Sequence, residues 1–289
     1  MKKIHQAFLI AGATTFTFAA CGNDTSTLAD VGDDYSPENP VDVKVGITGS
    51  DSPEWDHVAK LAEEEGIDVE IVRFSDYVQP NQALADGSID INAFQTVSFF
   101  DNFREEHDLD LAAIGSTVLA PMGLYSDKYD NVDDIPDGAE ITIDREITNQ
   151  ARNLMLLAEA GLLELEDDFG VTSGLDQIKD NPKELTLTEI APANAPRLMQ
   201  DVDASVINNG FAVDAGLSPA EDAIFREDET ATPYINIIAA QTKDQDNPVL
   251  QRLVELYQSE DVENVILEEH KGARIPTAIS LDELNSYPR

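Results

Sequence analysis

Residues 74–95 read FSDYVQPNQALADGSIDINAFQ, and this stretch indicates how the chain folds. It begins at the end of a β-branched, apolar run (67–74), continues through a short helical segment that Gly87 closes, and then reaches Ile89 and Ile91. A strand, a helix and a second strand in this order predict a βαβ unit, in which helices cover parallel strands.

The same alternation extends along the chain from Val41. It predicts a mostly parallel sheet in the first half, and a second unit repeats the theme from about residue 139. Two α/β units predict two lobes with a ligand cleft at the carboxyl ends of their strands. The expected strands are 41–47, 67–74, 89–91, 111–118, 139–143, 185–190, 204–207 and 234–240, and the expected helices are 53–65, 80–85, 98–107, 148–160, 194–200, 247–258 and 261–270.

The N-terminal segment MKKIHQAFLIAGATTFTFAA (1–20) has a basic start, an apolar stretch and small residues before Cys21, the sole cysteine. These features predict a secretory signal peptide. The residues up to Cys21 resemble the bacterial lipobox, which implies a lipidated (diacylglycerol, palmitate) cysteine at the extracytoplasmic face of the cell membrane. A cleaved signal with an incidental thiol is the alternative. We expect the polar residues 22–40 to form a flexible tether that reaches about 25 Å.

The composition is strongly acidic, with 57 Asp and Glu against 18 Lys and Arg and a formal net charge of −39. Such a surface repels nucleic acid and anionic lipid head groups, so neither is an expected partner. Because the acids are spread along the chain, we interpret them as a solvated surface adapted to a salty exterior. A cation-binding array is the weaker alternative, because the sequence lacks EF-hand-like spacing.

The sequence contains no motif for catalysis or metal binding. His57, His107 and His270 lack metal-ligand spacing, and there is no P-loop, G-x-S-x-G or C-x-x-C motif. No pair of acids stands out as general acid and base. We therefore expect a binding protein without catalytic residues, metal or cofactor. An extracellular hydrolase and a surface adhesin are the competing classes.

Arg152 is the leading candidate for a site residue. It is expected in the first turn of a helix that Thr148 or Asn149 caps, where free backbone amides add positive potential. A guanidinium forms two parallel hydrogen bonds with a carboxylate. On the residues alone, a surface arginine paired with one of the many acids is the default interpretation of Arg152.

The quoted stretch resembles the NlpA/MetQ family of methionine-binding lipoproteins, the capture subunits of ABC importers, whose pattern is close to F-x-D-Y-V-x-P-N-x-A-L-x-x-G-x-I-D-x-N-x-F-Q. The likeness continues at 148–162, 206–212 and 233–236, and covers about 41–272. It implies a two-lobed α/β fold of the type II periplasmic-binding-protein class, with mixed sheets flanked by helices. The partners it implies are a methionine-like amino acid, an ABC permease with its ATPase, and the membrane through the lipid anchor.

The resemblance also implies roles for polar residues. Arg152, with Asn149 in the same helix, would bind the α-carboxylate of an amino acid. Asn208 and Asn236 would contact its charged ends, because an amide offers both a donor and an acceptor. Without the resemblance, these two asparagines are equally compatible with ordinary turns after strands.

Aromatic residues complete the implied site. Tyr77 and Phe94 would hold an apolar or thioether side chain between them, since sulfur packs favourably on aromatic rings. Gln95 belongs to the same turn as Phe94, where it either orients the loop or contacts the ligand.

The chain departs from the family pattern around the side-chain pocket. Thr96, Ser98 and Phe99 stand where the family has His, Pro and Tyr, Ala120 stands where a larger side chain is expected, and residues 144–147 replace Pro-Asn-Asp-Pro. The expected ligand is therefore methionine or a related amino acid, with a methionine-containing dipeptide or a different amino acid as alternatives.

The expected domain organisation follows from the same reading. Lobe 1 comprises 41–122 plus about 225–275, lobe 2 comprises 123–224, and residues 276–289 form a tail with no assigned structure. Two crossovers join the lobes, which we expect to close over the ligand by a hinge.

Overall fold

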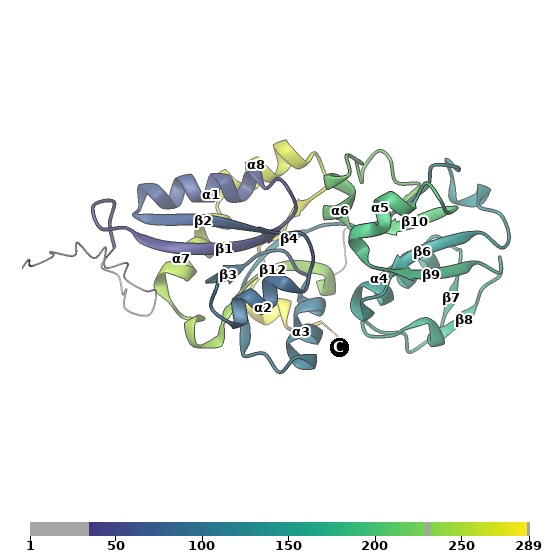
Figure 1. The fold of residues 1–289 in the computed structure, drawn as a ribbon, viewed down its shortest axis with the longest axis horizontal. Coiled ribbons are helices and arrows are strands. Elements are labelled where there is room, and N and C mark those ends of the chain that lie inside the picture. Colours follow the sequence, from purple (N-terminus) through teal and green to yellow (C-terminus); the bar gives the residue numbers. More distant parts are fainter. Residues whose placement is uncertain (1–34, 229–231, 288–289) are drawn as a thin grey trace, which may run out of the picture.

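The computed structural model describes residues 35–228 and 232–287, which form two lobes, each built around its own sheet (Figure 1). The predicted signal peptide, Cys21 and most of the predicted tether lie outside these residues. No helix within the described ranges has the length and apolar character needed to cross a membrane.

The first lobe contains a six-stranded sheet. In spatial order its strands are β13 (Ile275–Pro276), β4 (Leu111–Leu119), β12 (Ile235–Gln241), β3 (Ile91–Asn92), β1 (Val41–Thr48) and β2 (Ile67–Phe74). β1 pairs in parallel with β2 and β3, as the βαβ pattern predicts, whereas β12 runs antiparallel to β3 and β4. The sheet is therefore mixed.

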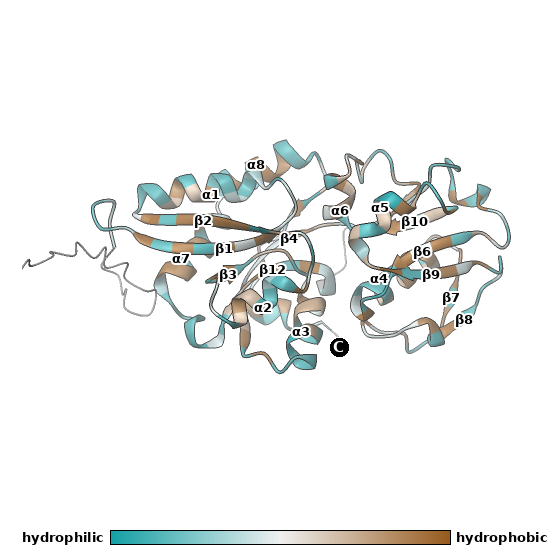
Figure 2. Ribbon diagram, in the orientation of Figure 1, coloured by the Kyte–Doolittle hydropathy of each residue, from teal (hydrophilic) through white to brown (hydrophobic). Residues whose placement is uncertain are grey.

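Helices cover this sheet on both faces. They are α1 (Pro53–Glu64), α2 (Gln79–Ala85), α3 (Val97–Glu106), α7 (Pro248–Tyr257), α8 (Glu260–His270) and α9 (Leu281–Leu284). α1, α7 and α8 share one apolar cluster with β1, whereas α2, α3 and α9 share another with β12. Figure 2 shows the corresponding apolar colouring along the strands and on one side of the helices. Burial of these side chains from water holds the lobe together.

The second lobe contains a five-stranded sheet. In spatial order its strands are β11 (Phe225–Arg226), β5 (Gly123–Tyr125), β10 (Ala204–Ile207), β6 (Glu140–Asp144) and β9 (Thr186–Ile190). β6 pairs in parallel with β9 and β10, and β5 and β11 add antiparallel neighbours. β7 (Glu164–Leu165) and β8 (Ile178–Asp180) form a separate pair.

Three helices accompany the second sheet. α4 (Ile147–Glu159) packs against the main apolar cluster of the lobe through Leu154 and Leu157. α5 (Ala195–Leu198) and α6 (Asn209–Asp214) share a smaller cluster that contains Tyr125 and Ile207. The sequence pattern did not predict α6, whose six residues are too short for a helical period to be recognised.

The chain passes between the lobes twice. One passage leads from β4 to β5 through residues 120–122, and the other leads from β11 to β12. Because β11 pairs with β5, the return begins after Arg226, slightly later than the predicted boundary at about 225. β13 pairs with β4, and Leu284 and Tyr287 enter the core of the first lobe, so the described part of the predicted tail is folded.

The start of the described chain also differs from the prediction. Ser36 and Asn39 pair in a turn, and Tyr35 packs against the core of the first lobe, so folded structure begins before Val41. Gly66 allows this contact. Its φ is +88°, and a Cβ atom there would lie 2.2 Å from the Ser36 carbonyl carbon.

The predicted N-cap of α4 is wrong. The helix begins at Ile147, Glu146 is its N-cap, and Thr148 and Asn149 lie inside its first turn. The Asp144 carboxylate accepts the backbone N–H of Glu146 at 2.9 Å, and this bond forms the turn that starts the helix one step earlier.

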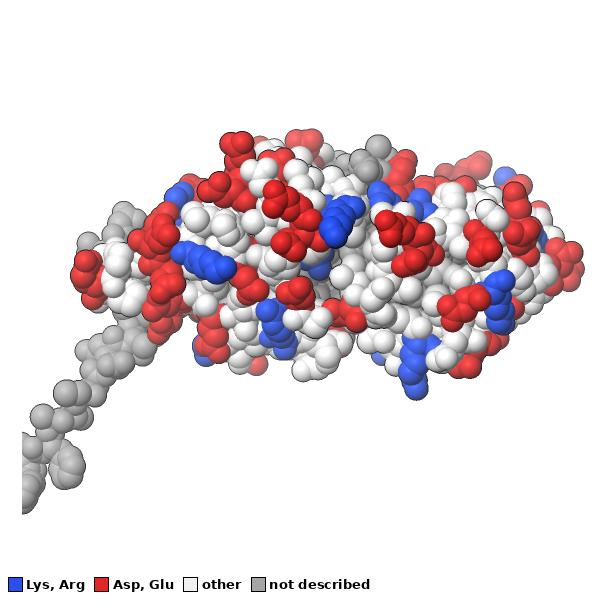
Figure 3. All heavy atoms as spheres, turned by 90° about the horizontal axis from the view of Figure 1, so that it is seen from above, with Lys and Arg blue, Asp and Glu red and all other residues white. Residues whose placement is uncertain are grey.

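Acidic side chains are spread over both lobes on the face seen in Figure 3, with few basic side chains between them. This distribution agrees with the interpretation of a solvated acidic surface.

Candidate functional site

A cavity lies between the two lobes, and all the predicted ligand-binding residues line it. Its space is about 810 Å³, part of it open to solvent. The predicted residues in its wall are Tyr77, Phe94, Gln95, Asn149, Arg152, Asn208 and Asn236, together with the departure positions Thr96, Phe99 and Ala120.

The elements that supply these residues explain why they meet. Tyr77 follows β2 and Phe94 follows β3, so both lie at the carboxyl edge of the parallel part of the first sheet. Asn208 follows β10 and Arg152 comes from α4, which follows β6 in the second sheet. The cavity therefore occupies the carboxyl ends of the strands in both lobes.

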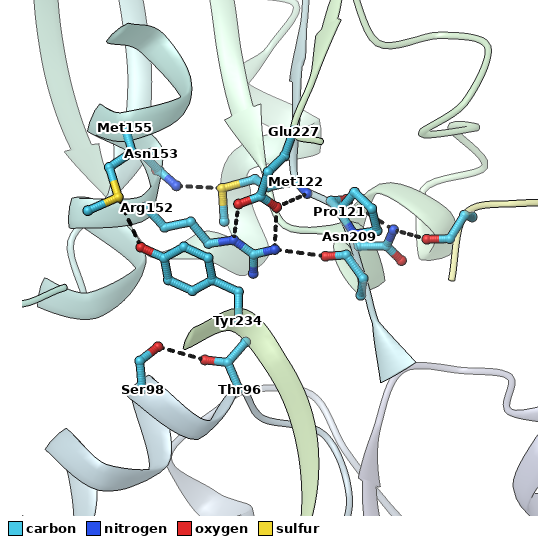
Figure 4. Close-up of polar contacts among 12 residues, drawn as sticks. Thr96, Ser98, Pro121, Met122, Arg152, Asn153, Met155, Asn209, Glu227 and Tyr234 are labelled. Carbon is cyan, nitrogen blue, oxygen red and sulfur yellow. Dashed lines mark hydrogen bonds and ion pairs between the residues drawn. The ribbon is translucent and has the colours of Figure 1, made fainter. Parts of the chain in front are cut away.

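Arg152 is buried and paired with Glu227, a residue that the sequence pattern did not single out. Its Nε donates to Glu227 Oε1 at 2.9 Å, and Nη2 donates to Oε2 at 2.5 Å and to the Ala120 carbonyl at 3.1 Å (Figure 4). The side chains of Arg152 and Glu227 are only 5% and 7% exposed. The guanidinium also lies 4.4 Å from the centre of the Tyr234 ring.

Arg152 stays positively charged, and some of its N–H donors have no acceptor among the described residues. Burial alone would lower the pKa of Arg152, but the Glu227 carboxylate more than offsets it and raises the pKa. A guanidinium has five N–H donors. The contacts to Glu227 and Ala120 involve Nε and Nη2, and no described residue accepts a hydrogen bond from Nη1. Nη1 is thus the part of Arg152 that can serve a carboxylate in the cavity.

The structure corrects two expectations for Arg152. It lies in the second turn of α4, so its guanidinium does not rely on the first-turn amides. Its acidic partner is also buried rather than on the surface. Glu227 lies between β11 and β12, on the second passage between the lobes. Its sequence context is like that of the many other acidic residues, so only its location in the fold identifies it as the partner of Arg152.

The aromatic residues form one wall and do not leave a slot. The ring centres of Tyr77 and Phe94 are 5.8 Å apart, and Tyr77 also lies 4.9 Å from Phe211 of the second lobe. These distances are those of direct ring contact. The predicted sandwich around a ligand side chain is therefore not formed in this structure. An apolar side chain can instead lie along the wall, which Phe99 extends.

The side chain of Gln95 belongs to a buried amide network. Its Nε2 donates to Asn81 and Asn92, at 2.7 and 2.9 Å, and its Oε1 accepts from Asn81 at 2.7 Å. Gln95 is 3% exposed. Since buried amides require partners, this network fixes the loop that carries Phe94. The side chain of Gln95 therefore serves as scaffold.

The two candidate asparagines occupy different settings. Asn236 is the second residue of β12, inside the strand predicted at 234–240, so the alternative of a turn after a strand does not apply to it; its Nδ2 donates to the Phe94 carbonyl at 3.4 Å. Asn208 is the N-cap residue of α6, but its side chain makes no capping bond. The Asn208 amide has no hydrogen-bond partner among the described residues, so it is free for a ligand in the cavity.

Thr96 and Ala120 define the altered part of the pocket. Thr96 caps α3 by accepting the backbone N–H of Phe99 at 3.3 Å, and its hydroxyl lies 3.3 Å from that of Ser98 (Figure 4). A histidine at this position would fill space that the shorter threonine leaves open. The Ala120 carbonyl accepts a hydrogen bond from Arg152. Its methyl side chain lines the cavity and fills less of it than a larger side chain would.

A second charged cluster lines the cavity away from Arg152. Glu54 binds Arg274 at 2.5 Å and His270 at 2.9 Å, and Glu54 and Arg274 are both lining residues. Burial alone would raise the pKa of Glu54, but the His270 hydrogen bond and the Arg274 charge lower it to about 2. Trp55, the third residue of α1, is buried and also lines the cavity.

The lobes also touch outside the cavity. Ser50, in the loop after β1, donates from its backbone N–H and its hydroxyl to Asp214 of α6, at 3.0 and 2.8 Å. Together with the contact between Tyr77 and Phe211, this bond closes the cleft on one side. Among the described residues, no group of three or more His, Cys, Asp or Glu is arranged to hold a metal ion.

Comparisons with known proteins find a matching family model, similar lipoproteins and similar solved structures. The family model described as NlpA lipoprotein matches residues 43–278. The chain is 37% identical over 245 residues to the uncharacterized lipoprotein YhcJ of Bacillus subtilis (strain 168), covering 85% of this chain and 88% of that protein. It is 36% identical over 250 residues to the D-methionine-binding lipoprotein MetQ of Escherichia coli (strain K12), covering 85% and 92%. A nutrient binding protein from Burkholderia cenocepacia, solved bound to methionine, matches with a TM-score of 0.78 and 38% identity, covering 81% and 99%.

Proposed function

The chain belongs to the NlpA lipoprotein family, and from this premise we propose that it captures methionine or a related amino acid outside the cytoplasm and delivers it to an ABC importer. The observation that carries the proposal is that Arg152, whose Nη1 has no acceptor among the described residues, and Asn208, whose amide has no partner among them, line the same cavity. Binding and release, without chemical change of the ligand, are the function.

Each part of a methionine zwitterion has a partner in this cavity. The carboxylate binds Nη1 of Arg152, because a charge-assisted bond to a guanidinium is short and strong. The ammonium donates to the amide oxygens of Asn208 and Asn236. The thioether lies on the aromatic wall of Tyr77 and Phe94, where sulfur contacts are favourable.

Transport requires the cavity to open and close. The two interlobe passages act as the hinge, and the bond between Ser50 and Asp214 forms when the lobes close. These two passages join the lobes. The closed form docks on a permease, and an ATPase drives transport through it.

The N-terminal segment supplies the location. Signal cleavage and lipidation at Cys21 anchor the chain to the outer face of the cell membrane, and residues 22–34 lead from the anchor to the folded part. Holding the binding protein beside its permease raises its local concentration there.

The ligand is identified by mass spectrometry of the small molecules that the purified protein releases on unfolding. Titration calorimetry of the refolded, ligand-free protein with L-methionine then measures affinity. Arg152→Lys keeps a charge for Glu227 but loses the Nη1 donors, so its affinity should fall about 10- to 100-fold. Arg73→Lys, at an exposed ion pair, is the matched control and should bind normally. Normal binding by Arg152→Lys would remove the carboxylate assignment.

A methionine-containing dipeptide is a second candidate ligand. Glu54 and Arg274 line the same cavity as Arg152 and can meet charged or polar groups of a longer ligand. Calorimetry with methionine and with dipeptides that contain it separates the two. Tighter binding of a dipeptide would favour this candidate.

A further inference from the structure

The cavity contains a second arginine, Arg274, besides the one assigned to the α-carboxylate. Among the lining residues only Glu54, Arg152 and Arg274 carry a formal charge. In a chain with 57 Asp and Glu against 18 Lys and Arg, two arginines against one acid make the cavity wall a place that favours anionic groups. The α-carboxylate of the proposed ligand gives Arg152 a role and leaves Arg274 without one.

The two arginines differ in which edge of the guanidinium is occupied. The Nε and Nη2 edge of Arg152 bonds Glu227, so Nη1 is the group left for a ligand. In Arg274, Nη1 donates to Glu54 Oε1 at 2.5 Å, and no described residue accepts a hydrogen bond from Nε or Nη2. Nε–H and Nη2–H together form a planar fork that matches both oxygens of a carboxylate. The fork that Glu227 fills in Arg152 is therefore available in Arg274.

Glu54 and His270 hold Arg274 in place. The Glu54 side chain is 3% exposed, and its two oxygens have different partners. Oε1 accepts from Arg274, and Oε2 lies 2.9 Å from Nε2 of His270. Both oxygens of Glu54 are therefore engaged, and they fix the guanidinium at one edge. A guanidinium that is already fixed loses little freedom when a ligand binds its other edge.

The backbone places Arg274 where the two lobes meet. After α8, Lys271 and Gly272 have positive φ values of +48° and +87°, which end the helix and turn the chain sharply. The next carbonyl, that of Ala273, accepts Nδ2 of Asn209 from the second lobe at 2.6 Å. Asn209 and Arg274 both line the cavity. A ligand group on Arg274 thus binds a segment that is itself bonded across the lobe boundary.

We propose that Arg274 is a second carboxylate-binding residue of the cavity, and that it favours ligands which carry a second carboxylate besides the α-carboxylate. The second carboxylate belongs either to the side chain of a single amino acid or to an added residue. The inference rests on the proposed function, which places the α-carboxylate at Arg152 and the ammonium at Asn208 and Asn236.

The test is titration calorimetry with two matched pairs of ligands. They are L-glutamate with L-glutamine, and aspartyl-methionine with asparaginyl-methionine. The members of a pair have nearly the same size and differ in one carboxylate, so the ratio of their affinities isolates that group. In at least one pair the acid should bind about 10- to 100-fold more tightly than the amide, because its bonds to the guanidinium are charge-assisted. The pair that shows this preference identifies the source of the carboxylate. Ratios of about one in both pairs, or no binding by any of the four compounds, would overturn the proposal.

Arg274→Lys tests whether this residue is responsible. Lysine keeps a positive charge beside Glu54 but has no planar fork, so the acid-to-amide ratio should fall to about threefold or less. Because the net charge of the chain is unchanged, the acidic surface repels an acidic ligand equally in both proteins. Arg73→Lys, at an exposed ion pair away from the lining residues, is the matched control and should keep the wild-type ratio. A wild-type ratio in Arg274→Lys would overturn the assignment.

Calorimetry with L-methionine separates this inference from the proposed function. Methionine has no second carboxylate, so Arg274→Lys should change its dissociation constant by less than about twofold. Methionine binding together with acid-to-amide ratios of about one would contradict the role of Arg274 and leave the proposed function standing. An acid preference that depends on Arg274, without methionine binding, would contradict the proposed ligand and support the role of Arg274.

Discussion

Arg152→Met should destabilise the ligand-free protein by about 3–5 kcal/mol, because it leaves the Glu227 carboxylate buried without its counter-charge. The two hydrogen bonds that disappear are 2.9 and 2.5 Å long and lie between side chains that are almost fully buried. The bond to the Ala120 carbonyl and the contact with the Tyr234 ring are lost as well. Each is worth about 1 kcal/mol, which places the expectation in the upper half of the range.

The double variant Arg152→Met/Glu227→Leu separates stability from binding. Replacing both members of a buried ion pair with apolar groups of similar size is often nearly neutral, so most of the lost stability should return. Methionine binding should not return, because the guanidinium is still missing.

Urea unfolding followed by circular dichroism measures the stabilities. Arg252→Met is the control, because Arg252 binds Glu65 at 2.8 Å while both side chains are 37% exposed; its cost should stay within about 1 kcal/mol. If Arg152→Met costs no more than Arg252→Met, the account of the buried pair is refuted. Methionine binding by the double variant would refute the role of Arg152 in the cavity.

Three further predictions concern other parts of the molecule. Burial alone would raise the pKa of Glu54, but its bonds to His270 and Arg274 lower it from 4.5 to about 2, so its stabilising effect is present above pH 4.5 and is lost as the pH falls towards 2. Glu54→Gln should flatten that acid limb of the urea-unfolding profile, and an unchanged limb would speak against the cluster. Gln95→Ala should cost about 1–3 kcal/mol and weaken methionine binding, because the buried Asn81 Nδ2 and Asn92 Oδ1 lose their hydrogen-bond partner; unchanged stability would show that the network is dispensable. With a formal net charge of −39, the melting temperature should rise from low to molar NaCl as screening increases, and a flat profile would contradict the interpretation of the surface.

The sequence predicted those features that depend on residues close together in the chain. Period and β-branching predicted β1 and β2, and the position after a strand predicted that Tyr77 and Phe94 share an edge with the ligand cleft. β12 could not be assigned its place between β3 and β4 in this way, because strand order depends on contacts far apart in the chain.

The missed site residues share a cause. Glu227 pairs with Arg152 across 75 positions, and Arg274 reaches Glu54 across 220. Single acids and bases in so acidic a sequence carry no pattern that marks them as partners. The Tyr77 sandwich failed because sequence indicates which rings are near the cleft and does not give their separation.

The most direct test of the central claim is a crystal structure of this protein with methionine. The account predicts that the ligand carboxylate lies about 2.7–2.9 Å from Nη1 of Arg152, with the thioether against Tyr77 and Phe94. A cavity that stays without methionine, or a carboxylate bound to Arg274 instead, would contradict it.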